Sequence, residues 1–61
     1  SLVGRTMEEI EREVILKTLE RTGGNRTQAA EMLGIGLRTL QRKIKQYRVE
    51  GYPVMGADIG D

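Results

Sequence analysis

The chain has 61 residues and a formal net charge of +1 at pH 7, and it contains neither cysteine nor histidine. A core of this size rarely contributes more than about 3–5 kcal/mol of folding free energy by itself. Disulfides are excluded, and the lack of both Cys and His argues strongly against a zinc site. Oligomerisation or close helix packing is left as the source of stability.

No segment resembles a signal peptide or the run of about 18 apolar residues that a membrane helix needs. We therefore expect a soluble, cytoplasmic protein. The chain begins with Ser1 rather than Met, and we expect it to be a fragment of something longer.

Charge is distributed unevenly along the chain. Residues 1–24 carry a net charge of −1 and residues 49–61 carry −3, whereas residues 25–48 carry +5. A basic block inside a near-neutral chain indicates an anionic partner, with nucleic acid as the first candidate. On charge alone, a solvated helix face without a partner is an equally open interpretation.

The first predicted helix has signals at both ends. Thr6 and Glu9 have the spacing of a capping box, in which each side chain bonds the backbone N–H of the other. The helix should then run to about Thr22. Gly23 stands where a helix needs a left-handed residue to end it.

Apolar residues lie on two faces of this first helix. One face carries Met7, Ile10 and Val14, and the other carries Ile15, Leu16 and Leu19. This apolar arc is wider than the single stripe of an ordinary surface helix. We favour a homodimer in which one of these faces covers the rest of the domain and the other meets a second subunit, while the alternative is that neighbouring helices of the same chain cover both faces.

Two shorter helices follow. Asn25 is a good N-cap for a helix from Arg26 to about Leu33, which Gly34 ends. Gly36 is a permissive but second-rank N-cap for a helix from Leu37 to about Tyr47. The apolar residues of that last helix recur at intervals of three and four (Leu37, Leu40, Ile44 and Tyr47), and its opposite side is basic (Arg38, Arg42 and Lys45).

The last two helices have the features of a helix-turn-helix. A three-residue, glycine-containing turn makes such helices cross at about 90–120°. That crossing needs small side chains where the backbones approach, and Ala29 and Ala30 supply them, while Gly34 can redirect the chain. Leu33, Ile35, Leu40 and Ile44 are expected to pack around the crossing. The predicted fold is all-α, a small domain of three helices with a long first helix suited to dimerisation.

The stretch GGNRTQAAEMLGIGLRTLQRKIKQY resembles the factor-for-inversion-stimulation (Fis) type of helix-turn-helix. The matching pattern is G-N-x-T-x-A-A-x-x-L-G-I followed by x-x-x-T-L-x-R-K-[IL]-K-x-Y. In this family the motif closes many NtrC-type regulators, the bacterial enhancer-binding activators of sigma-54 polymerase. The resemblance implies a homodimeric domain that binds double-stranded DNA at an inverted repeat.

The resemblance also implies which residues contact DNA. Base contacts correspond to the start and outer face of the last helix, at Leu37, Arg38 and Arg42 with Thr39 and Gln41 nearby. Phosphate contacts correspond to Asn25, Thr27, Gln28, Lys43 and Lys45. Arginine can bond guanine O6 and N7 bidentately, whereas Leu37 can only touch a thymine methyl group or pack.

We divide the chain into a disordered extension (1–5), the helix-turn-helix domain (6–48) and a flexible tail (49–61). Two alternative functions stay open: a Fis-like architectural protein that bends DNA with loose specificity, and a helical adaptor for an acidic protein. Enzymatic activity is disfavoured, because the first helix's carboxylates do not converge and no phosphate-binding glycine motif is present. No cofactor is expected.

Overall fold

The computed structural model describes residues 1–56, and within that range the chain is all-α, as predicted. The helices are α1 (Met7–Arg21), α2 (Arg26–Leu33) and α3 (Leu37–Val49). The predicted start of each helix is correct. The end of α3 was predicted two residues too early, at Tyr47. No helix in the described range is long and apolar enough to cross a membrane.

The predicted caps of α1 and α2 are confirmed. The Thr6 hydroxyl accepts a hydrogen bond from the Glu9 backbone N–H at 3.0 Å, and the Glu9 carboxylate accepts one from the Thr6 N–H at 3.0 Å. The Asn25 side chain accepts a hydrogen bond from the Gln28 N–H at 3.0 Å. Gly36 begins α3 without any side-chain cap. Each of these arrangements involves residues at most three apart, which is why the sequence pattern could predict them.

All three helices end with the same hydrogen-bond pattern. A glycine with positive φ stands just beyond each helix: Gly23 (67°), Gly34 (73°) and Gly51 (91°). The residue after each glycine donates its N–H to a carbonyl in the helix's last turn: Gly24 to Leu19, Ile35 to Ala30, and Tyr52 to Tyr47. This is the Schellman arrangement, which satisfies carbonyls that the helix itself leaves unpaired.

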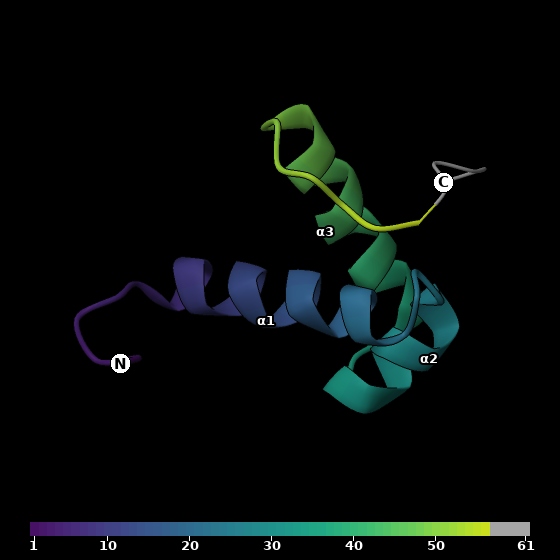
Figure 1. Ribbon diagram of the computed structural model, residues 1–61, viewed down its shortest axis with the longest axis horizontal. Coiled ribbons are helices and arrows are strands. Elements are labelled where there is room, and N and C mark those ends of the chain that lie inside the picture. Colours follow the sequence, from purple (N-terminus) through teal and green to yellow (C-terminus); the bar gives the residue numbers. More distant parts are fainter. Residues whose placement is uncertain (57–61) are drawn as a thin grey trace.

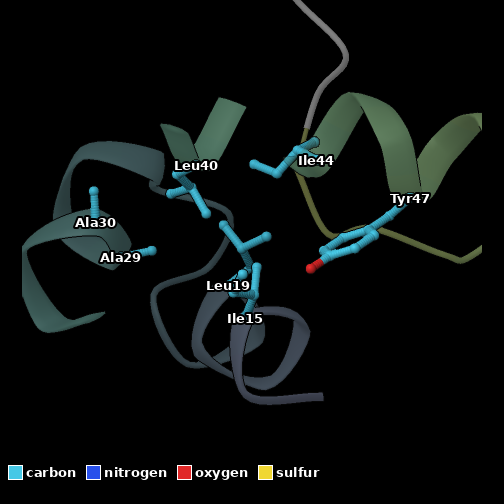
Figure 2. Close-up of a cluster of buried hydrophobic side chains, with 7 residues drawn as sticks. All are labelled: Ile15, Leu19, Ala29, Ala30, Leu40, Ile44 and Tyr47. Atoms are coloured by element: carbon cyan, nitrogen blue, oxygen red, sulfur yellow. The ribbon is translucent and has the colours of Figure 1, made fainter. Parts of the chain in front are cut away.

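The hydrophobic core gathers side chains from all three helices (Figure 2), namely Ile15, Leu19, Ala29, Ala30, Leu40, Ile44 and Tyr47. Leu19, Leu40 and Ile44 are fully buried. Leu33 and Ile35 are half-buried against this cluster. Tyr47 is also part of the core, with 5% of its surface exposed.

The helices are arranged so that α1 and α3 diverge (Figure 1). The short helix α2 packs against the C-terminal end of α1 and the start of α3, and the N-terminal half of α1 extends away from it. Ala29 and Ala30, both buried, allow this close approach. After α3 the chain turns back along that helix, and its last described residue is Gly56.

The two ends of the described chain contact the helices. Arg5 forms an ion pair with Glu13, and Val54 packs against the core. Part of the predicted tail, residues 57–61, lies outside the described residues. Disorder in residues 1–5 and flexibility from residue 49 onward stay predictions.

Candidate nucleic-acid interface

The outward face of α3 is basic and exposed. Arg38 and Arg42 stand one helical turn apart, on the side opposite the buried Leu40 and Ile44. Lys45 extends the same face by almost another turn, and it is exposed as well. Because the core fixes the opposite side of the helix, this face must point away from the protein.

Two shallow grooves run along α3 beside these cations. One is lined by Leu37, Arg38, Gln41, Arg42 and Lys45. The other is lined by Thr39, Arg42, Lys43 and Gln46. Leu37 is 39% exposed, while Thr39 and Gln41 are half-buried. The five positions predicted for base contacts therefore line these two grooves, which share Arg42.

A second set of predicted contacts lies at the start of α2. Asn25, Thr27 and Gln28 are all exposed there. The first turns of α2 and α3 contain no acidic residue. Backbone N–H groups and the helix dipole give a helix N-terminus a partial positive charge, which suits it to phosphate.

Lys43 occupies a position that the sequence pattern did not reveal. Its ammonium nitrogen lies 2.8 Å from the Oε1 atom of Glu11 on α1. This hydrogen bond raises the pKa of Lys43 above its ordinary value, with the charge of Glu11 as a further contribution. Lys43 therefore joins α3 to α1. No sequence signal pairs it with Glu11, since the two are 32 residues apart.

The face of α1 that carries Met7, Ile10 and Val14 is only partly covered by its own chain. Met7 is 78% exposed and Val14 is 45% exposed. A groove on this side is lined by Met7, Ile10, Glu11, Val14, Ile15, Leu33 and Ile35. The other face, by contrast, contributes Ile15 and Leu19 to the core. The alternative in which neighbouring helices cover both faces is wrong for Met7 and Val14.

A three-helix domain whose last two helices meet at a tight turn, with a basic outer face on the final helix, is a helix-turn-helix DNA-binding domain. The profile of a family described as bacterial regulatory protein, Fis family, matches residues 6–47. That range starts at the N-cap of α1 and ends within α3. The chain belongs to the Fis family of bacterial regulatory proteins.

Curated relatives are similar over 62–88% of this chain. The chain is 48% identical over 54 residues to the transcriptional regulatory protein FlbD of Caulobacter vibrioides, an alignment covering 88% of this chain and 12% of FlbD. It is 55% identical over 38 residues to the transcriptional regulatory protein ZraR of Escherichia coli K12, an alignment covering 62% of this chain and 9% of ZraR. It is 44% identical over 41 residues to the DNA-binding protein Fis of Glaesserella parasuis, an alignment covering 67% of this chain and 42% of that protein.

The chain thus spans only about a tenth of the length of FlbD and ZraR. No solved structure matches it significantly.

Proposed function

We propose that this chain is the sequence-specific DNA-binding domain of a cytoplasmic bacterial transcriptional regulator, of the kind that activates sigma-54 polymerase. Helix α3 lies in the major groove of its DNA site. The observation that carries the proposal is the exposed arginine pair Arg38 and Arg42 on the outer face of the second helix of a Fis-family helix-turn-helix. Two relatives that are named as transcriptional regulatory proteins support the same role.

Within this proposal the residues of α3 divide by chemistry. Arg38 and Arg42 hydrogen-bond base edges, guanine above all. Leu37 touches a thymine methyl group, and Thr39 and Gln41 flank the arginines. The phosphate contacts come from Asn25, Thr27, Gln28, Lys43 and Lys45. Lys43 has a second role in its ion pair with Glu11. That pair is exposed enough for Lys43 to exchange Glu11 for a phosphate group of DNA.

The proposal includes a homodimer through α1. Its support is the apolar groove that leaves Met7 and Val14 exposed, together with the small size of the core. A two-fold dimer presents its recognition helices to an inverted repeat whose half-sites are about 34 Å apart, one turn of DNA. Residues 6–48 form the binding domain. We propose no cofactor and no catalytic role for it.

The test is selection of bound sequences from a random duplex library at near-physiological salt, followed by affinity measurements on the selected site. The variant Arg38→Ala plus Arg42→Ala should bind that site about a hundredfold or more weakly, because each bidentate contact contributes about 1–3 kcal/mol. The matched control is Arg5→Ala plus Lys17→Ala. It removes the same charge from α1 and the residue before its N-cap, away from α3, and should bind nearly as wild type.

The outcomes separate the candidate functions. An enriched inverted repeat, lost with the α3 arginines and kept in the control, supports the proposal. Salt-sensitive binding to bulk DNA without an enriched motif favours the architectural alternative. An absence of DNA binding even at low salt overturns the DNA-binding role and leaves the protein adaptor.

A further inference from the structure

The segment after α3, Gly51–Gly56, forms a strap that returns from the end of α3 toward the turn between α1 and α2 (Figure 1). It begins where Tyr52 donates its N–H to the Tyr47 carbonyl at 2.9 Å. The family match ends at residue 47, so the strap lies beyond the matched region. Its contacts add to the links that the core and the Lys43–Glu11 ion pair make between α1 and α3.

Tyr52 is the first point of attachment. Its ring stands edge-on to the ring of Tyr47 on α3, with 6.4 Å between the ring centres and an angle of 81° between their planes. The Tyr52 ring also contacts α1, because the guanidinium carbon of Arg12 lies 4.2 Å from the ring centre. Edge-to-face and cation–π contacts are both favourable at these separations. One side chain thus connects α1 to the C-terminal half of α3.

The far end of the strap is attached as well. Val54 packs against the core, and the Arg48 side chain donates a hydrogen bond to the Gly56 carbonyl at 3.3 Å. Gly56 also lies against the turn between α1 and α2. A Cβ atom built on Gly24 would come within 2.7 Å of the Gly56 Cα atom, closer than real Cβ atoms approach. The two glycine backbones are therefore in direct contact.

These contacts matter because α1 and α3 touch each other much less than each touches α2. Outside the core, the Lys43–Glu11 ion pair and the strap both link α1 to α3. Exposed ion pairs contribute little to stability. The strap adds ring contacts and a core contact to that ion pair, on the half of α3 that lies beyond the helix-turn-helix crossing.

We propose that the strap is a positioning element that sets the angle between α1 and α3, with Tyr52 as its main anchor. The inference rests on the proposed function: in a dimer built through α1, this angle determines how far apart the two recognition helices stand. The strap then determines how strictly the protein discriminates between half-site spacings. Tyr52 itself need not touch DNA.

The angle can be measured without DNA. Because the chain has no cysteine, Glu8→Cys plus Val49→Cys places two spin labels at exposed sites near the far ends of α1 and α3. The distribution of label distances within one chain should be narrow with Tyr52 present. It should broaden in Tyr52→Ala and stay narrow in Tyr52→Phe, which keeps the ring. Equal widths in the two variants would overturn the proposal.

A second pair of variants tests the strap independently, in case Tyr52→Ala unfolds the whole domain. Gly23→Ala and Gly24→Ala both place a methyl group at positive φ (67° and 87°), but only the second meets the strap. Gly24→Ala should change the label distances, and Gly23→Ala should leave them as in wild type. If both changed the distances alike, backbone strain and not the strap would be the cause.

The consequence for DNA is measured on the selected inverted repeat and on versions lengthened or shortened by one base pair. Wild type should lose about tenfold or more in affinity at the wrong spacing, and Tyr52→Ala only about threefold. Both should bind an isolated half-site alike. Unchanged discrimination in Tyr52→Ala would overturn the role in spacing. If wild type selected no inverted repeat, the proposed function would fail, while the label distances would still decide the role of the strap.

Discussion

Helices α1 and α3 share one core but present different chemistry to the outside. Ile15 and Leu19 of α1 are buried beside Leu40 and Ile44 of α3. Away from that core, α1 exposes the apolar residues Met7 and Val14, whereas α3 exposes Arg38, Arg42 and Lys45. This small domain therefore has two outward surfaces of different chemistry, one apolar on α1 and one basic on α3.

The largest expected effect comes from truncating a side chain of the core that α1 and α3 share. Leu40→Ala empties a fully buried position and should cost about 2–5 kcal/mol, comparable to the whole stability of a domain this small. We expect a largely unfolded chain by circular dichroism and loss of DNA binding. Leu37→Ala, on the same helix but 39% exposed, is the control and should unfold near the wild-type urea concentration. A folded Leu40→Ala protein would show that α1 and α3 do not depend on one core.

A smaller effect, confined to one surface, is expected from Val14→Glu. Val14 is 45% exposed in the single chain, so the charge should leave the monomer fold intact. In a dimer it would be buried without a partner, and self-association measured by sedimentation equilibrium should weaken about tenfold or more.

The reciprocal control is Arg38→Ala plus Arg42→Ala, which should lose DNA binding but keep self-association. If Val14→Glu associated as wild type does, the exposed face of α1 would not be the dimer interface.

The smallest effect concerns the contacts between the two helices at high pH. Burial raises the pKa of Tyr47, and the hydrogen bond to Glu11 raises the pKa of Lys43. A raised pKa means that the stabilisation is fully present below the ordinary value and is lost as the pH rises through the folded-state value. The urea concentration at the unfolding midpoint should therefore decrease as the pH rises beyond about 10. Tyr47→Phe removes the tyrosine contribution, and its midpoint should fall less steeply over the same range.

Below neutral pH a different group matters. Hydrogen bonds from Arg5 and Lys17 lower the pKa of Glu13, so its stabilisation is lost only as the pH falls through that lowered value.

For the alkaline prediction, an unchanged urea midpoint between neutral and alkaline pH would show that neither Tyr47 nor Lys43 links α3 to α1 through its charge state.

The sequence by itself determined the helices, their beginnings and the basic outer face of α3. These features depend on residues within one or two helical turns of each other. Thr6 and Glu9 are three apart, Asn25 caps an N–H three residues on, and Gly34 acts on the preceding turn. The end of α3 was predicted too early because its glycine, Gly51, lies four residues beyond Tyr47 and was assigned to the tail.

Only the tertiary structure decided how α3 is held against α1. Lys43 meets Glu11 across 32 residues of sequence, and Arg12 meets Tyr52 across 40. Neither pair has a spacing that a helix period or a turn could reveal. The same holds for the uncovered face of α1, because whether Met7 and Val14 are buried depends on where α2 and α3 come to lie. Local hydrogen bonds shape each helix, but the packing of distant side chains determines which faces remain available to a partner.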